Sequence, residues 1–494
     1  MFRSAPARFF AALLVMGLAA CDEILADLKP APADPRRAAI EDLVVAHVDA
    51  GLFEGAILVA EGDAVIFKSA YGMADRTWNI KNTTDTRFHI GSVGKQLTGA
   101  IVMQLIEEGK LSLDDTLSEL IADYPDVHGA DVTLGHLLDH TSGIPNYTAT
   151  PAFRTRSASP IARADLAALF ADAPLEFSPG ATFSYNNSGF FLAGVIIEAI
   201  EGKHYGEVLK ERLLEPLGLD DMGYGYSDAV IPGYAESYVW NGAAYAPATP
   251  THDTWILSSA MVYADVDDLF RWTRALFAGA PFKRPGSRDA VLELPEGKER
   301  NYAFGVGNVP LEFGGEAVRG VGHSGALDGY RSTQSVIVEK DWTVIILSNI
   351  GVDQNLLAER INRLLAGETV EAPKPPVSRK LGRLIAADGE AAAGAWFRRQ
   401  REENPSAYDF DEGGLNDLGY ALLAKGDFPA AILVFTLNTE AFPESANAYD
   451  SLGEAYRAAG RNALALASYE KSLAMDPSNA NAEAAIAALK EQGL

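Results

Sequence analysis

Apolar runs predict strands near both ends of the N-terminal part of the chain, with helices between them. Gly55–Ala60 and Ala64–Ala70 are apolar runs separated by a short polar turn, which predicts a β-hairpin. Arg331–Val338 and Thr343–Ser348 are apolar and β-branched, and a shorter strand is predicted before them at Tyr302–Val306. This order predicts one antiparallel sheet flanked by helices, with a helical subdomain packed against it, which is an α/β (α+β) fold class.

The helices are indicated by apolar residues at spacings of three and four. Leu97, Ile101 and Leu105 show this spacing, and Asp265 stands where an N-cap begins another helix. The clearest predicted helices are Ala38–Ala50, Gln96–Glu108, Thr133–His140, Phe190–Glu201 and Leu356–Ala366. We expect this domain to cover residues 36–367, because 368–378 contains three prolines without an apolar period and is typical of a linker.

Beyond this linker, residues 379–494 repeat a pattern of small and apolar residues after 34 positions. The matching pairs are Leu418 and Leu452, Gly419 and Gly453, Ala431 and Ala465, Phe435 and Tyr469, and Pro443 and Pro477. This period and pattern are those of tetratricopeptide repeats, so we predict a helical repeat domain that presents a surface to a protein partner. Arg379–Arg401 is expected to add a packing helix and Ala480–Lys490 to close the end, because two repeats are few. A helical tail that serves only as a spacer is the alternative.

The N-terminus predicts a secretory signal peptide over residues 1–20. Arg3 and Arg8 precede an apolar stretch, Phe9–Ala20, that is short for a membrane span. The next residue is Cys21, the only cysteine of the chain, and Leu18-Ala-Ala-Cys21 resembles the lipobox of bacterial lipoproteins. The resemblance implies lipidation of Cys21, with 21–35 as a tether. An incidental thiol after an ordinary cleavage site is the alternative.

The charge of the chain excludes some partners. Arg3 and Arg8 leave with the signal, so 41 minus 2 gives 39 basic residues against 67 acidic ones, a net charge of −28. Such a charge argues against nucleic acid and against electrostatic binding to anionic lipids. We therefore expect attachment to a membrane through acyl chains only. Together with the signal peptide, this predicts a bacterial cell-envelope protein that faces the periplasm.

The first candidate for chemistry is Ser92-Val-Gly-Lys95, just before the helix predicted at Gln96–Glu108. This position gives Ser92 the free N–H groups and the positive end of a helix, which favour an alkoxide or an oxyanion. Lys95 follows one turn later, and an ammonium kept from water loses its proton more readily. The short pattern recurs at Ser468 and Lys471 on a predicted repeat helix, so it needs support from other residues.

Two later motifs supply that support. Tyr185-Asn-Asn187 offers a phenol that could act as phenolate toward Ser92 if its pKa is held low, and an amide that can bind both a lysine and a substrate. His323-Ser324-Gly325 lies among the C-terminal strands, where glycine lets a backbone approach a substrate. The N–H groups of Ser92 and Ala326 would then form an oxyanion hole, with Ser324 and Gly325 beside it.

S-x-x-K, Y-x-N and H-x-G in this order, with Thr141-Ser-Gly-Ile-Pro145 between the first two, resemble serine hydrolases related to class C β-lactamases. That family also holds DD-peptidases, D-amino-acid peptidases and S-x-x-K carboxylesterases, and the resemblance covers about residues 36–366. It implies a five-stranded or larger antiparallel sheet beside a helical subdomain.

Position by position, the resemblance implies Ser92 as the acylated nucleophile, Lys95 and Tyr185 as the proton-transfer pair, Asn187 as a positioning group, and His323 in the third motif. In the lactamases this third motif is K-T-G. His323 lacks the permanent charge of that lysine, which favours esters, peptides or amides over β-lactams.

The sequence thus predicts a lipid-anchored serine hydrolase that acts on a small molecule or a peptide through an acyl-enzyme, without metal or other cofactor. Two alternatives remain open. One is a penicillin-binding-like scaffold with little or no activity whose repeats recruit a partner. The other is a true β-lactamase.

Overall fold

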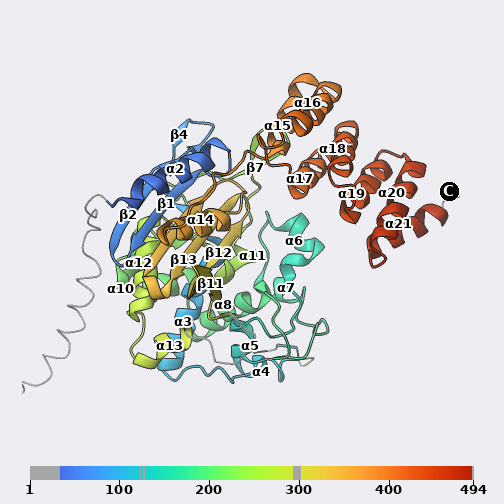
Figure 1. Cartoon of the computed structure of the whole chain (residues 1–494). Helices are drawn as coiled ribbons and strands as arrows, with labels where there is room; N and C mark the ends of the chain where they lie inside the picture. Colours follow the sequence, from blue (N-terminus) through green and yellow to red (C-terminus); the bar gives the residue numbers. More distant parts are fainter. Residues whose placement is uncertain (1–33, 123, 126–127, 293–301, 492–494) are drawn as a thin grey trace, which may run out of the picture. The chain divides into compact units, whose positions relative to one another are not determined.

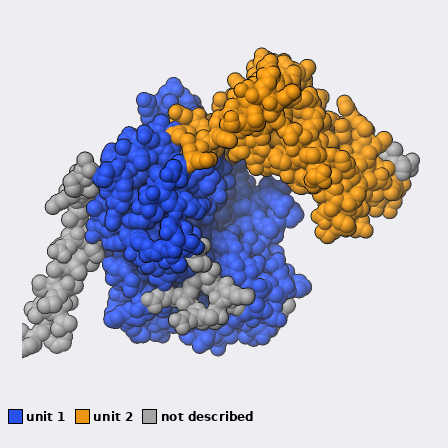
Figure 2. All heavy atoms as spheres, in the orientation of Figure 1, with its two compact units in different colours: residues 1–45, 53–238, 247–370 blue, residues 46–52, 239–246, 371–494 orange. Residues whose placement is uncertain are grey.

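The computed structural model describes residues 34–122, 124–125, 128–292 and 302–491, so the predicted signal peptide and Cys21 lie outside the described residues. The chain divides into two compact units (Figure 2). Unit 1 comprises 1–45, 53–238 and 247–370, and unit 2 comprises 46–52, 239–246 and 371–494.

Unit 1 is built on a seven-stranded antiparallel sheet in the order β10-β11-β12-β13-β14-β1-β2 (Figure 1). The strands of this sheet are β1 (Gly55–Glu61), β2 (Ala64–Tyr71), β10 (Tyr302–Ala303), β11 (Val306–Phe313), β12 (Glu316–Leu327), β13 (Tyr330–Ile337) and β14 (Trp342–Ser348). N- and C-terminal segments meet where β1 pairs with β14, with Leu58 opposite Ile345. The predicted antiparallel sheet with strands from both ends is confirmed.

The shorter strands and the helices of unit 1 surround this sheet. The other strands are β3 (Met73–Asp75), β4 (Ile80–Lys81), β5 (Phe88–His89), β6 (Gly223–Tyr224) and β9 (Val262–Ala264). The helices are α2 (Arg36–Asp49), α3 (Lys95–Glu107), α4 (Leu117–Leu120), α5 (Leu134–Leu138), α6 (Pro151–Arg156), α7 (Arg163–Ala167), α8 (Asn187–Glu201), α9 (Tyr205–Leu209), α10 (Glu215–Leu217), α11 (Asp253–Ile256), α12 (Val266–Ala278), α13 (Pro285–Leu292) and α14 (Asn355–Leu365). Asp265 does cap α12, because its side chain accepts a hydrogen bond from the backbone N–H of Asp268 at 2.8 Å.

One part of the sheet is larger than predicted. The expected single strand at Tyr302–Val306 is instead the short β10 followed by a long hairpin of β11 and β12. Its residues include Gly314, Gly320 and Gly322, and such glycines weaken any reading of a strand from sequence. We infer that the antiparallel pairing of β12 with β13 stabilises these strands more than their own sequence pattern does.

Strand β13 shows how the two faces of the sheet are used. Thr333 and Ser335 face α14, where they bond to Asn355 at 3.1 Å and Asn362 at 3.1 Å. Gln334 points to the opposite face and donates to Thr273 of α12 at 2.7 Å. Alternate residues of one strand thus bind helices on opposite faces, as the two-residue period of a strand requires.

Helix α3 is enclosed by the core of unit 1. Of its 13 residues, only Gln104 and Ile106 are not buried. Such a helix must satisfy its polar groups internally. Gln96 does so through Gln334 on one side and the indole N–H of Trp272, at 3.2 Å, on the other.

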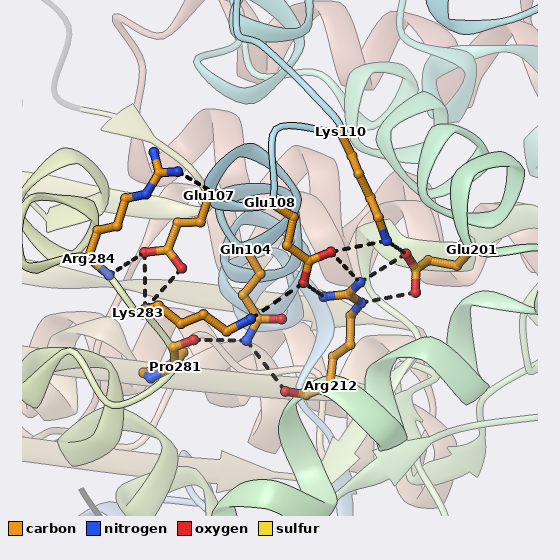
Figure 3. A network of polar contacts seen from close by, with 9 residues as sticks. All are labelled: Gln104, Glu107, Glu108, Lys110, Glu201, Arg212, Pro281, Lys283 and Arg284. Atoms are coloured by element: carbon orange, nitrogen blue, oxygen red, sulfur yellow. Dashed lines mark hydrogen bonds and ion pairs between the residues drawn. The ribbon is translucent and has the colours of Figure 1, made fainter. Parts of the chain in front are cut away.

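The C-terminal end of α3 is held by a cluster of charges (Figure 3). Arg212 binds Glu108 at 3.0 and 3.1 Å and Glu201 at 2.9 and 3.1 Å, while Lys110 lies 3.0 Å from both carboxylates. These contacts lower the pKa of Glu108 to about 2, chiefly through the hydrogen bonds from Arg212. The cluster joins α3 to α8 and to the π-helical turn η3 (Lys210–Leu214).

Unit 2 contains the helices α15 (Val377–Asp388), α16 (Glu390–Glu403), α17 (Glu412–Ala424), α18 (Phe428–Ala441), α19 (Ala446–Ala458), α20 (Asn462–Met475) and α21 (Ala480–Glu491). Gly419 and Gly453 occupy equivalent places, since a Cβ there would lie 2.4 Å from Phe435 and 2.9 Å from Tyr469, respectively. The C-terminal helical region is confirmed, and its assignment to tetratricopeptide repeats stays a prediction.

Unit 2 also takes in residues from the hairpin of β7 (Tyr238–Trp240) and β8 (Tyr245–Pro247). Arg379 lies over the rings of Trp240 and Tyr245, at 5.1 and 5.3 Å, and donates to the Tyr245 hydroxyl at 2.6 Å. Glycines allow the close approach, because a Cβ on Gly382 would lie 1.7 Å from the carbonyl oxygen of Gly242. In neither unit do the described residues include a helix long and apolar enough to cross a membrane.

The charge cluster of α3 yields a prediction on stability. We expect Glu108→Gln to lower the free energy of unfolding by about 1–2 kcal/mol at pH 7, because the neutral amide loses the ion pairs with Arg212 and Lys110. Since the folded pKa of Glu108 is about 2 and its usual value is 4.5, the carboxylate stabilises fully above pH 4.5. The difference between the variant and the wild type should therefore shrink as the pH falls from 4.5 through about 2.

The measurement is urea unfolding at several pH values. Lys210→Gln is a matched control, because its exposed ion pair with Glu215 should contribute little. A Glu108→Gln penalty that does not change over this pH range would contradict the argument.

Candidate active site

Ser92 lies in a 3₁₀ turn, η1 (Gly91–Gly94), which leads directly into α3. The expected position at the start of a helix is thus refined, since one tighter turn precedes the α-helix. Gly91 has a φ of +53°, and a Cβ there would lie 2.7 Å from the backbone nitrogen of Ala326. Gly91 therefore allows both the turn and the approach of η1 to β12.

Strand β12 touches this turn from the other side. A Cβ on Gly325 would lie 2.0 Å from the carbonyl oxygen of Ile90. That oxygen accepts a hydrogen bond from the hydroxyl of Ser332 at 2.6 Å. The backbone nitrogen of Ala326 is thereby held close to η1. In this position the N–H groups of Ala326 and Ser92 can both donate hydrogen bonds to the carbonyl oxygen of a substrate.

The side chain of Lys95 is completely buried and bonds to three oxygens. Its Nζ lies 3.1 Å from the Oγ of Ser92, 2.8 Å from the Oδ1 of Asn187 and 2.7 Å from the carbonyl oxygen of Ser259. The oxygens of Asn187 and Ser259 accept hydrogen bonds only, so the nitrogen donates to both. A neutral amine has two N–H groups and one lone pair, and this lone pair is left for the hydroxyl of Ser92.

Burial lowers the pKa of Lys95 well below its usual value of 10.5. None of its three oxygen partners carries a negative charge that would oppose this effect. The surroundings of Lys95 thus favour the neutral amine that the hydrogen-bond count also fits.

Tyr185 lies on the extended segment that leads into α8. Asn186 caps that helix by accepting from the N–H groups of Ser188 and Gly189, and Asn187 donates to the hydroxyl of Thr148 at 3.2 Å. The ring of Tyr185 lies 5.1 Å from the Nζ of Lys95. The Y-x-N motif is therefore held by the start of α8.

The phenol of Tyr185 favours its protonated state. Burial raises its pKa above the usual value, and a hydrogen bond with Ser92 opposes this only in part. The residue as a whole is 36% exposed, so the enclosed part is the end that carries the hydroxyl. The phenolate expected from the sequence is thus disfavoured, because no effect in the site lowers this pKa below its usual value.

His323 faces the same site from β12 and is held by two hydrogen bonds. Its Nδ1 donates to the carbonyl oxygen of Ser324, so its Nε2 accepts the hydroxyl of Tyr302 at 2.9 Å. Burial is the main cause that lowers the pKa of His323, to about 4. His323 is therefore neutral at pH 7, and its bonds go to Tyr302 and Ser324 rather than to Tyr185.

A cavity of about 750 Å³ opens over these residues. Strand β12 pairs with β11 only up to Gly322, so the edge from His323 to Leu327 has no strand partner on that side among the described residues. Side chains along the cavity include Ser92, Tyr185, Tyr302, His323, Leu311 and Phe313. The structure thus brings together Ser92, Lys95, Tyr185, Asn187, His323 and the Ser324–Ala326 backbone at one open strand edge.

Three members of the site gave no signal in the sequence. Ser259 acts through its backbone carbonyl, which any residue could supply. The sequence predicts only a strand around Tyr302, and Thr148 follows the Thr141–Pro145 loop without a motif of its own. The second S-x-x-K is different, because Ser468 donates to the backbone of Leu464 at 3.0 Å, while Lys471 donates to Tyr449 at 2.7 Å.

No group of three or more His, Cys, Asp or Glu residues suited to a metal ion occurs among the residues that the structure describes.

Known proteins resemble a large part of this chain. Penicillin-binding protein 4* of Bacillus subtilis is 26% identical over 349 residues, which cover 66% of this chain and 76% of that protein. The crystal structure of a penicillin-binding protein from Bacillus halodurans matches with a TM-score of 0.56 and 25% identity, covering 65% of this chain and 98% of that one. D-amino acid amidase from Ochrobactrum anthropi SV3 matches with a TM-score of 0.57 and 21% identity, covering 68% and 99%.

A match to a protein family is consistent with these similarities and with the geometry of the site. Residues 40–368, which hold every member of the site, match the family described as Beta-lactamase. The match covers more than half of the chain, so this chain belongs to the Beta-lactamase family of serine hydrolases.

Proposed function

We propose that this protein hydrolyses ester or amide bonds, including those of peptides, through an acyl-enzyme on Ser92. The observation that carries the proposal is the buried Nζ of Lys95, 3.1 Å from the Oγ of Ser92 and with its lone pair free for that hydroxyl. A serine is a weak nucleophile until a base takes its proton, and this arrangement supplies the base.

In the acylation step, the Oγ of Ser92 attacks the carbonyl carbon of the substrate and its proton passes to the Nζ of Lys95. The carbonyl oxygen becomes an oxyanion that the N–H groups of Ser92 and Ala326 stabilise. When the bond to the leaving group breaks, Tyr185 donates its phenolic proton to that group, and Lys95 returns a proton to Tyr185. Water then attacks the acyl-enzyme by the reverse route and releases the acid and free Ser92.

This scheme uses each group in the protonation state that its surroundings favour. Burial lowers the pKa of Lys95 and raises the pKa of Tyr185, so a neutral amine beside a phenol is the resting pair. Tyr185 therefore relays a proton as a phenol, in place of the phenolate expected from the sequence.

The surroundings of His323 bear on the class of substrate. A neutral imidazole bonded to Tyr302 offers no fixed positive charge to a carboxylate beside the reacting bond. This supports uncharged esters, amides or peptides over β-lactams, whose carboxylate calls for a cation. The name of the similar amidase also supports amide bonds. A true β-lactamase and an inactive scaffold are the alternatives that the experiments below separate.

We further propose that the enzyme is held at a bacterial membrane on its periplasmic side by a lipid on Cys21, and that its C-terminal helices recruit a protein partner. The support is in the sequence, namely the lipobox-like Leu18–Cys21 segment and the repeats of residues 379–494. Acyl chains are what a chain of this negative charge would need for attachment.

The nucleophile is tested by intact mass after incubation with a fluorophosphonate, a penicillin and a short-chain ester. We expect the fluorophosphonate to add to Ser92 with loss of fluoride, and Ser92→Ala to abolish both this adduct and ester turnover. Ser468→Ala in the second S-x-x-K is the matched control and should label normally. Turnover by Ser92→Ala at the wild-type rate would contradict the proposal, and no adduct on the wild type would favour the scaffold.

The proton-transfer pair is tested by single-turnover acylation. Lys95→Ala and Tyr185→Phe should each slow acylation by about 10³-fold or more, because the two groups move protons as one unit. The double variant should be little slower than either single one. In the wild type, the rate should rise with pH and level off well below pH 10.5, since burial lowers the pKa of Lys95. Losses that multiply in the double variant would show two independent roles.

His323 is tested by its effect on selectivity. His323→Ala should cost about 10²-fold in kcat/KM, because it removes the acceptor of Tyr302 and disturbs the wall of the site. His323→Lys should shift preference toward substrates with a carboxylate. The imidazole of His323 should add no titration near pH 6.5 to the wild-type pH profile, because the pKa of His323 is about 4 and it stays neutral above that value. A loss in His323→Ala as large as in Ser92→Ala would make this histidine the general base.

A further inference from the structure

His140 brackets Tyr185 by binding the residues on both sides of it. Its carbonyl oxygen accepts the backbone N–H of Ser184 at 2.9 Å, and its Nδ1 accepts the backbone N–H of Asn186 at 3.1 Å. His140 follows α5, 45 positions before Tyr185 in the chain. One residue of a distant loop thus fixes the main chain on either side of the phenol.

The imidazole of His140 also covers the phenol ring. Its centroid lies 4.4 Å from that of Tyr185 and 4.5 Å from that of Tyr302, and the residue is 1% exposed. Tyr302 in turn donates to His323. His140 is therefore packed between two tyrosines of the site, in addition to its bonds with the backbone.

This placement is unfavourable for His140 itself. Its φ is +58°, a left-handed conformation that few residues other than glycine adopt. Because Nδ1 accepts a hydrogen bond, the ring proton is on Nε2, and this buried N–H has no hydrogen-bond partner among the described residues. Such strain persists where the surroundings require one conformation, and it gathers at functional sites.

We propose that His140 is a positioning residue for acylation, which holds the phenol of Tyr185 in line with Ser92 and Lys95. The inference rests on the role proposed for Tyr185. His140 does not act as a base, because its Nδ1 is occupied by Asn186 and its Nε2 carries the proton. Its effect passes through the backbone and the ring of Tyr185, where a shift of about 1 Å is enough to slow a reaction 10²-fold.

The chemistry of the side chain gives a matched set of variants. His140→Asn keeps an acceptor at the place of Nδ1 and tolerates positive φ, so Ser184 and Asn186 stay bound. His140→Gln moves the acceptor one bond farther from the backbone, and His140→Leu removes it. Leu166→Ala in the core of unit 1, at 0% exposure and on α7, is the control for lost stability alone.

The test measures the rate constant (kinact) and the affinity (KI) for fluorophosphonate labelling of Ser92, with the melting temperature of each variant. We expect His140→Leu and His140→Gln to lower kinact by about 10–100-fold with KI changed less than about threefold, and His140→Asn to stay within about threefold of wild type. Leu166→Ala should melt earlier and label at the wild-type rate. If His140→Leu does not fold, the Asn and Gln variants carry the comparison.

A double variant separates positioning from a general structural role. Adding His140→Leu to Tyr185→Phe should cause no further loss, because the phenol that His140 positions is already absent. Losses that multiply, a His140→Leu rate equal to wild type, or a His140→Asn rate as low as that of His140→Leu would each overturn the assignment. If the fluorophosphonate does not label Ser92 in the wild type, the proposed function is overturned as well. If wild type and His140→Leu are labelled at the same rate, only the role of His140 is overturned.

Discussion

The arrangement of unit 1 depends on keeping the amine of Lys95 away from water without placing a negative charge beside it. Water would restore the usual pKa of Lys95, and a carboxylate would hold its proton in place. The three oxygens around Nζ come from η1, from the start of α8 and from the segment before β9, so three distant parts of the chain must meet at one atom. The burial of nearly all of α3 in the core follows from the same need, since that helix carries Lys95.

The polar groups around α3 show how the fold meets this demand. Gln96 and Gln334 bind each other behind the site and are anchored by Trp272 and Thr273, so both polar atoms of the Gln96 amide are hydrogen-bonded. Its far end is fixed by the charges around Glu108 (Figure 3). A helix held at both ends cannot slide, and hydrogen bonds of about 3 Å at the reactive end depend on that rigidity.

Much of the fold could be predicted from the sequence, because local patterns and tertiary packing agree there. The strands β1 and β14 are continuous apolar runs, α14 is apolar at the helical period, and Asp265 caps α12. The β11–β12 hairpin was missed, since its glycines weaken a strand pattern and only its neighbours stabilise it. In the site, Ser92, Lys95, Tyr185 and His323 follow from motif order. Ser259 could not be predicted, because it contributes a backbone oxygen that any residue could supply. Tyr302, the partner of His323, could not be predicted either, because a tyrosine in a strand is usually a core residue.

The hairpin that carries Trp240 and Tyr245 has a consequence for how the protein is made. These residues are synthesised more than 130 positions before Arg379, the side chain that covers both rings in unit 2. During translation the rings of Trp240 and Tyr245 therefore lack their contact with Arg379 until the intervening chain has been synthesised. For the same reason, replacing residues 371–494 by another helical segment would leave the rings of Trp240 and Tyr245 without a contact, unless the new segment supplied one. We therefore expect the sequences of the hairpin and of the C-terminal helices to change together.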